Sequence, residues 1–516
     1  MLIRAALVVI AVYATGDWIA GVAVAALLLV WWLLSSAEGP PVLALAVTYQ
    51  WVQVSVGIFY SALIGEPLEA MVKSDWRTMV LIGLGCVVTL AVALSVGLTF
   101  ARGRLTAPDT RPQLAFSPTV VYAAYGASVL VTGVVQEIAW NYPSITQAIL
   151  ALNFSHLALV FLLARRFTRP VFAWEKLAAL MALEVALGFT GYFANFREPL
   201  LMGSIALVEV FDRRDTRHWM FFAAVVVVLG VSSVVWMSVR GELRRDVDEE
   251  IETTRMERLD KVRALSSGFF SEGGDYREST TRVIERVWAI YYPALAIERV
   301  PSVLPHTNGE VIQGALSHLV TPRILFPDKG ELPSDSEMVR KYSGVHVAST
   351  EENTSIAFGY AAESYIDFGL PWMFLPVLIY GLAMGAVYQG WLTVIRHREL
   401  AVSLVTVIFW LSLYVFERSW VKTMGLAITL MVYLGGCTYL IDQYLLARRA
   451  QREPTDAHGA LLGTLSETLE SSSCPCMRVL RARIRLRRAS AQHPWLVLGA
   501  AARRPRCARH HDDRER

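Results

Sequence analysis

Charged residues and cysteines are both scarce in this sequence. Of its 516 residues only 18% are charged, whereas 54% are hydrophobic. Soluble domains carry about 25% charged residues, so this balance excludes an ordinary soluble enzyme and favours a membrane protein. The five cysteines are Cys86, Cys437, Cys474, Cys476 and Cys507. None lies in the long polar segment 239–368, and Cys474 and Cys476 lack redox or zinc spacing, so we expect no disulfide framework, metal or cofactor.

The sequence also predicts no cleavable signal peptide. The first apolar run, residues 3–15, has no cleavage-like boundary and leads directly into a second apolar run. We therefore expect the chain to remain whole in the membrane.

Apolar runs long enough to cross a bilayer recur along the chain, since a spanning helix needs about 20 residues. The clear runs are 17–34, 41–64, 77–99, 117–136, 145–163, 171–191, 218–238, 369–391, 400–416 and 421–446. Two shorter runs, 3–15 and 198–211, bring the total to about twelve. The sequence therefore predicts an all-α polytopic membrane protein.

Arginine positions predict the orientation, because cytoplasmic loops carry the excess of basic residues. Clusters at 102–111, 165–169, 213–217, 396–398 and 448–452 fall on one side when 198–211 counts as a span. Both termini are then cytoplasmic, and 239–368 faces outward between spans nine and ten. The predicted parts are a nine-span bundle (1–238), a mostly helical periplasmic loop (239–368), three further spans (369–446) and a flexible basic cytoplasmic tail (447–516).

The outward loop begins as a charged helical extension of span nine and continues with a second helical stretch near Thr280–Ala296. Its polar stretches are interrupted by proline and glycine, so we expect no compact core of its own and packing against the spans. Three motifs follow: Thr321-Pro-Arg-Ile-Leu-Phe-Pro-Asp-Lys329, Asn353-Thr-Ser-Ile-Ala-Phe-Gly359 and Ala362-Glu-Ser-Tyr-Ile-Asp-Phe-Gly369.

The order of these motifs just before a span resembles the Wzy-type O-antigen and exopolysaccharide repeat-unit polymerases, closely over residues 320–390. The resemblance implies a glycosyltransferase of the bacterial inner membrane that acts at the periplasmic face. It would transfer a growing glycan between undecaprenyl diphosphate carriers and use no nucleotide sugar. The expected partners are these lipid-linked glycans, the bilayer and a chain-length regulator, and no nucleic acid.

Cations near the outer face are the expected diphosphate ligands, because arginine binds phosphate oxygens bidentately and lysine adds a point charge. The candidates for binding substrate are Arg197, Arg323, Lys329, Arg418 and Lys422, with Tyr365 as a ring that stacks on sugar.

Proton transfer from the acceptor hydroxyl calls for a carboxylate. Glu363 is the predicted catalytic acid or base, since burial near the membrane would raise its pKa. Asp367, four residues on, would orient Glu363 or bind a sugar hydroxyl. Alternatively, Glu363 pairs with an arginine and only seats the loop. The ionisable residues His156, Glu184 and Glu209 are interpreted as groups that link helices or reach the interface.

Three other functions remain open. A twelve-span secondary transporter shares the number of spans, but a long outward loop after span nine and the absence of an internal repeat argue against it. An O-antigen ligase would use the same fold and charges, and only the loop motifs favour a polymerase. A sensor or scaffold on a membrane anchor is the non-enzymatic alternative.

Overall fold

A computed structural model describes residues 2–35, 39–71, 74–104, 116–141, 146–169, 172–189, 196–248, 260–261, 263–265, 276–321, 326, 330, 332–348, 355–449 and 451. Every regular element in these ranges is a helix and none is a strand, which confirms the predicted all-α class. The chain divides into two compact units, Met1–Asp442 and Gln443–Arg516. The packing and contacts described below lie within the first unit.

Six helices are long and apolar enough to cross a membrane, which is compatible with a multi-pass membrane protein. They are Val42–Ile64 (α3), Trp76–Arg104 (α5), Thr146–Thr168 (α7, Thr146–Asn153, with α8, Ser155–Thr168), Thr216–Met237 (in α11, Thr216–Asp248), Phe374–Val394 (α18) and Trp420–Arg449 (α20, Trp420–Thr429, a π-helical turn Leu430–Gly435 and the residues beyond). Each coincides with an apolar run in the sequence.

The other six predicted spans are helices too, and all except the 24-residue helix Pro118–Asn141 are shorter than a full crossing. They are Leu2–Thr15 (α1), Trp18–Leu34 (α2), Pro118–Asn141 (α6), Trp174–Gly188 (α9), Arg197–Val208 (α10) and Arg398–Leu413 (α19). At about 1.5 Å per residue, α10 is only about 18 Å long, against a hydrocarbon core of about 30 Å. Within the described residues the structure therefore supports six candidate spans, and the predicted twelve are not confirmed.

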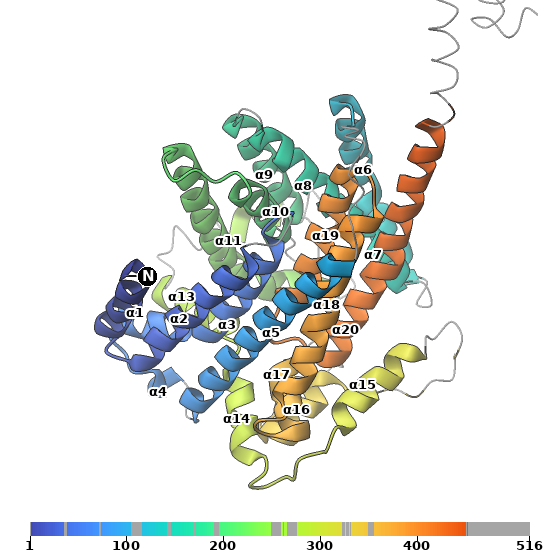
Figure 1. The fold of residues 1–516 in the computed structure, drawn as a ribbon. Helices are drawn as coiled ribbons and strands as arrows, with labels where there is room; N and C mark the ends of the chain where they lie inside the picture. The colour runs from blue at the N-terminus through green and yellow to red at the C-terminus, as the bar shows by residue number, and fades with distance from the viewer. Residues whose placement is uncertain are drawn as a thin grey trace, which may run out of the picture. The chain divides into compact units, whose positions relative to one another are not determined.

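Two pairings position the rest of the bundle (Figure 1). Helices α5 and α18 lie side by side because glycines let their backbones approach. A Cβ atom at Gly97 would collide with the Leu382 carbonyl oxygen, and one at Gly385 with that of Leu94. Helix α19 contacts α3 and α8, and all its residues from 401 to 413 are buried. It therefore forms the centre of the core, and its ends meet two different polar clusters.

Ion pairs join helix ends at the arginine-rich side of the unit. Arg165 Nε lies 2.8 Å from Glu209 Oε2, and Arg169 Nη2 lies 3.1 Å from Glu209 Oε1. Arg166 Nη2 lies 3.0 Å from Glu399 Oε2 at the start of α19. These pairs gather basic residues that the sequence predicts on one side of the membrane.

The described part of segment 239–368 is mostly helical, as predicted. Helix α11 continues to Asp248, and the stretch predicted near Thr280–Ala296 is two helices separated at residues 288–290. The helices of the segment are Tyr276–Val287 (α13), Tyr291–Arg299 (α14), Glu310–Val320 (α15), Asp335–Ser343 (α16) and Tyr360–Phe368 (α17); a further short helix, Leu68–Met71 (α4), lies before α5. In Figure 1, α14 to α17 gather beyond one end of α5 and α18.

The expectation that this segment has no core of its own is wrong. A small core of eight buried side chains holds α14, α16 and α17 together: Ala296, Val300, Val339, Tyr342, Val347, Phe358, Ala362 and Ile366. Contacts of α14 with α16 and α17 bring these residues together, although prolines and glycines interrupt the sequence between the helices.

Trp288 anchors this segment to α3, which agrees with the expected packing against the spans. Its indole Nε1 donates to the Val54 carbonyl oxygen at 2.9 Å, and the Ala289 backbone N–H donates to that of Gln53 at 3.0 Å. The ring packs against Gly57 of α3, where a Cβ atom would lie 2.5 Å from it.

Candidate functional site

Two of the predicted cations, Arg197 and Arg418, meet around Tyr414. The Arg418 guanidinium carbon lies 5.7 Å from the centre of the Tyr414 ring, and Arg418 Nη1 donates to the Leu411 carbonyl oxygen at 2.7 Å. Arg197 begins α10, and its half-exposed guanidinium approaches the hydroxyls of Tyr49 and Tyr414. Segments far apart in the sequence thus place two positive charges beside one aromatic side chain.

Glu198 supplies a carboxylate directly beside these cations. The Tyr414 hydroxyl donates to Glu198 Oε1 at 3.2 Å, and Arg197 Nη2 lies 4.0 Å from the same oxygen. The second oxygen, Oε2, is buried and has no hydrogen-bond partner within the described part of the chain. Buried polar atoms nearly always have a partner, so this oxygen is available to a ligand or water. Glu198 is not among the residues predicted from the sequence, although an acid directly after Arg197 at the start of an apolar helix was the available signal.

Aromatic rings form one wall of this site. The Tyr414 ring stacks on the Trp410 ring with a centroid distance of 5.1 Å and an interplanar angle of 14°. The centroid of the Tyr49 ring lies 5.5 Å from that of Tyr414. The indole Nε1 of Trp410 is buried without a partner among the residues the structure describes. Trp410 and Tyr414 are buried, and Tyr49 is partly exposed. Aromatic rings next to unpaired polar atoms suit a sugar, which has both apolar ring faces and hydroxyls.

Segment 239–368 contributes a third cation through an ion pair. Arg286 of α13 places Nη1 3.2 Å from Glu417 Oε2. Glu417 also acts electrostatically on Arg197, so it belongs to the same charged group. Three arginines and two carboxylates leave the group with one net positive charge, which favours an anionic ligand.

Glu363 lies on the other side of the segment that carries Arg418. Its buried carboxylate accepts the Trp420 backbone N–H at 2.7 Å, and the Tyr360 N–H donates to the Arg418 carbonyl oxygen at 2.8 Å. Burial raises the pKa of Glu363 to about 8, against the smaller opposing effect of the Trp420 hydrogen bond. Among the described residues Glu363 forms no ion pair with arginine, so the arginine-seating alternative is not observed there. Glu363 instead fixes the start of α20 behind Arg418.

Asp367 is four residues along α17 and has a different partner. Its carboxylate accepts the Val311 N–H at 3.0 Å and the Ile312 N–H at 2.9 Å, together with the Thr307 hydroxyl. These groups belong to the N-terminus of α15, where a carboxylate compensates unpaired backbone donors and the helix dipole. Asp367 therefore holds α15, and its observed hydrogen bonds do not include Glu363.

The remaining predicted site residues lie apart from Tyr414 or outside the described residues. Lys422 Nζ is paired with Asp335 Oδ2 at 2.6 Å and bonds Ser355 Oγ at 2.8 Å, which links α20 to α16. The Tyr365 ring contacts the edge of His306, with a centroid distance of 5.6 Å. Arg323 and Lys329 lie outside the described residues.

A second polar group is buried between α6, α8 and α9. His156 Nε2 lies 3.0 Å from Glu184 Oε2, and His156 Nδ1 lies 2.9 Å from Ser128 Oγ. The Tyr125 hydroxyl donates to the other Glu184 oxygen. The prediction that His156 and Glu184 form interhelical hydrogen bonds is confirmed, as is the position of Glu209 at the end of its helix, where it pairs with Arg165.

Comparison of the chain with protein-family models, with curated proteins and with solved structures gives no match. Within the described residues no group of three or more histidine, cysteine, aspartate or glutamate side chains is placed to hold a metal ion.

Proposed function

We propose that this protein is a membrane glycosyltransferase that polymerises oligosaccharide repeat units carried on undecaprenyl diphosphate. The observation that carries the proposal is the meeting of Arg197 and Arg418 at Tyr414, beside stacked aromatic rings and unpaired buried polar atoms. Two guanidinium groups suit a diphosphate, and the aromatic wall suits the sugar attached to it. The motif resemblance over residues 320–390 supports the same function independently of this geometry.

In the proposed reaction a hydroxyl of the incoming repeat unit attacks the anomeric carbon of the growing chain. A new glycosidic bond forms, and the bond between the anomeric carbon and the diphosphate oxygen breaks. The carrier diphosphate leaves with the bonding electron pair, and its increasing negative charge is stabilised by Arg197 and Arg418. The hydroxyl proton passes to a carboxylate of the site.

Glu198 is the carboxylate that the geometry favours for accepting this proton. One of its oxygens is unpaired, and it lies beside both the cations and the aromatic wall. Glu363, the base that the sequence analysis favours, is held by the Trp420 N–H and has a pKa of about 8, so it is mostly protonated at neutral pH. In this proposal Glu363 is a positioning residue that fixes the segment bearing Arg418, and its role as the base is the rival hypothesis.

The test is the composition of lipid-linked glycans in a strain that lacks the protein. We expect single lipid-linked repeat units to accumulate, and polymer to return with the wild-type chain but not with Arg197→Ala or Arg418→Ala at matched membrane levels. Accumulation of long lipid-linked chains would instead indicate the ligase alternative. Unchanged lipid-linked glycans would contradict both.

A further inference from the structure

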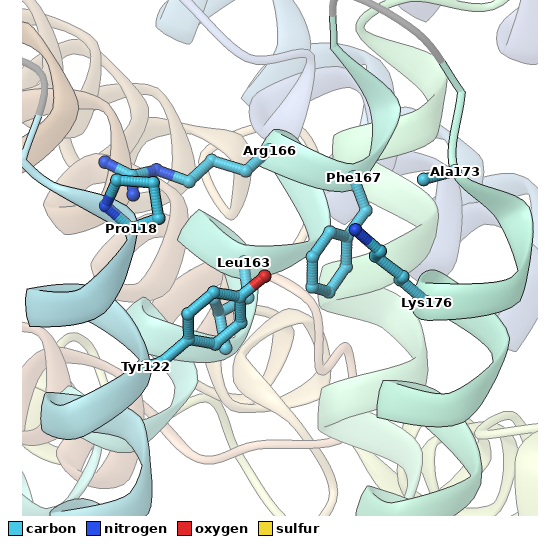
Figure 2. Close-up of a pocket in the computed structure, with 7 residues that line it drawn as sticks. All are labelled: Pro118, Tyr122, Leu163, Arg166, Phe167, Ala173 and Lys176. Carbon is cyan, nitrogen blue, oxygen red and sulfur yellow. The ribbon is translucent and has the colours of Figure 1, made fainter.

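A cavity of about 370 Å³ lies between α6, α8 and α9, and none of its lining residues belongs to the Tyr414 site. Pro118 and Tyr122 come from α6, Leu163, Arg166 and Phe167 from α8, and Ala173 and Lys176 from the start of α9. Figure 2 shows the Tyr122 and Phe167 rings between the helices, with the Lys176 amine beside Phe167 and the Arg166 guanidinium beside Pro118.

The two cations of this cavity have free hydrogen-bonding capacity. Arg166 Nη2 donates to the Phe116 carbonyl oxygen at 2.5 Å and to Glu399, which fixes the guanidinium. Arg166 Nη1 is buried and has no partner among the described residues. Lys176 is exposed and forms no ion pair with the described residues. A fixed donor and a flexible ammonium therefore face one space, and no carboxylate lines it.

The surroundings make this space more positive. The cations near it are Arg165, Arg169 and Arg398, and the carboxylates are Glu209, Glu399 and Glu175, which directly precedes Lys176 in α9. Arg165 and Arg169 share a single carboxylate, so their charges are only partly neutralised. Together with Arg166 and Lys176, the cations clearly outnumber the carboxylates, and the field favours an anion.

The rest of the cavity is apolar. Leu163 and Phe167 are buried, and Tyr122 is about half exposed with its ring along the cavity wall. A small inorganic anion would leave these apolar surfaces in contact with water. A ligand with a phosphate at one end and hydrocarbon at the other would contact both parts of the site, and such basic pockets between membrane helices suit anionic lipid headgroups.

We propose that this cavity binds an anionic phospholipid, with its phosphate between Arg166 and Lys176 and its first hydrocarbon segments against Tyr122, Leu163 and Phe167. The lipid would bridge α6 to α8 and α9, the same three helices that the buried Glu184 group connects. Its expected consequence is a bundle that is more stable in anionic than in zwitterionic lipid.

The experiment uses the full-length protein in detergent, titrated with phosphatidylglycerol, with phosphatidylcholine or with inorganic phosphate. Thermal unfolding and native mass spectrometry report the binding. We expect phosphatidylglycerol alone to raise the melting temperature and to remain bound. Lys176→Met should weaken this binding by about tenfold, the factor that corresponds to one lost charge-assisted hydrogen bond. Arg217→Met removes an exposed cation outside the cavity and should bind like the wild type.

Lys176→Glu is a second variant. It keeps a charged side chain at an exposed position and should abolish the stabilisation by phosphatidylglycerol. Equal stabilisation by phosphatidylcholine, or an equal loss in Lys176→Met and Arg217→Met, would overturn the proposal. Stabilisation by inorganic phosphate alone, at the level seen with phosphatidylglycerol, would assign the site to free phosphate and overturn the lipid assignment.

Discussion

The Tyr414 hydroxyl donates a 3.2 Å hydrogen bond to Glu198 Oε1 and so joins the end of α19 to the start of α10. An arginine reaches this point from each side: Arg197 lies directly before Glu198 in α10, and Arg418 lies four residues after Tyr414 in the segment between α19 and α20. One contact between two short helices therefore assembles the cations, the carboxylate and the aromatic wall of the proposed site.

Glu198→Gln tests the proposed base. Glutamine keeps the shape and can accept the Tyr414 hydroxyl, but it cannot take a proton. Loss of a general base lowers rates by about a hundredfold to ten-thousandfold, so polymer should nearly disappear while the membrane level and melting temperature stay close to wild type. The assay is polymer formation normalised to membrane protein.

Glu363→Gln is the matched comparison. Its glutamine oxygen can still accept the Trp420 N–H, and the carboxyl that it replaces is mostly protonated at neutral pH. We therefore expect polymer within a few-fold of wild type. The reverse pattern, with activity lost in Glu363→Gln and retained in Glu198→Gln, would return the base assignment to Glu363.

Arg418→Lys and Arg197→Lys should each reduce polymer formation, although both substitutions conserve the positive charge. Lysine loses the planar fork that binds two phosphate oxygens, and at position 418 it also loses the geometry of the bond to the Leu411 carbonyl. Each variant should reduce polymer by about tenfold or more, the effect of one strong charge-assisted hydrogen bond. Arg282→Lys, at an exposed position of α13, is the control and should be fully active. Full activity in all three variants would refute specific phosphate recognition by Arg197 and Arg418.

The sequence predicts the helices well and the contacts of the site poorly, for a physical reason. Apolar runs report where a helix is buried, so all twelve predicted spans coincide with helices, but the clear run 171–191 does not reveal that α9 contains only 15 residues. Asp367 looks like a partner of Glu363 because the two are one turn apart. Its actual partners are backbone N–H groups near residue 311, which carry no sequence signal.

Tertiary packing also decides which of the predicted cations meet at Tyr414. Arginine alternation places Arg197 and Arg418 near one face, but their meeting at Tyr414 depends on the packing of α10 against neighbouring helices. Lys422 satisfies the same sequence criterion and is paired with Asp335 instead. The sequence therefore identifies the charged residues, whereas the choice of partner is decided by tertiary structure.

Stability should depend on pH through Glu363. Its pKa in the folded protein is about 8, above the ordinary value of 4.5, so the folded state binds this proton more tightly than the unfolded state. The stabilisation is complete below the unfolded pKa and is lost as pH rises through about 8. The melting temperature of the wild type, measured from pH 5 to 9 in detergent, should fall relative to that of Glu363→Gln. Parallel curves for the two proteins would contradict the raised pKa.

Asp367→Asn should weaken the fold and not the chemistry. Asparagine replaces charge-assisted bonds to two backbone N–H groups with neutral ones, which should cost about 1–2 kcal/mol of unfolding free energy. Polymer should fall only in step with the amount of folded protein. Glu310→Gln removes an exposed acid from the same helix end without a capping bond and serves as the control. Selective loss of activity at a normal melting temperature would instead make Asp367 a catalytic candidate.

The proposed orientation predicts which face of the membrane exposes Ser302 and Thr216. Both positions are exposed: Ser302 follows α14 in the outward segment, and Thr216 begins α11 beside the arginine-rich end of the unit. In a variant whose five native cysteines are replaced, Ser302→Cys should react with a membrane-impermeant maleimide on intact cells. Thr216→Cys should react only after the inner membrane is permeabilised. This result is expected because cytoplasmic loops carry an excess of basic residues, which places the clusters around residues 165–169 and 213–217 inside.

Because the Tyr414 site lies at the opposite end of α10 from Glu209, labelling of Thr216→Cys alone on intact cells would place that site in the cytoplasm. A polymerase acting on exported lipid-linked units would then be excluded.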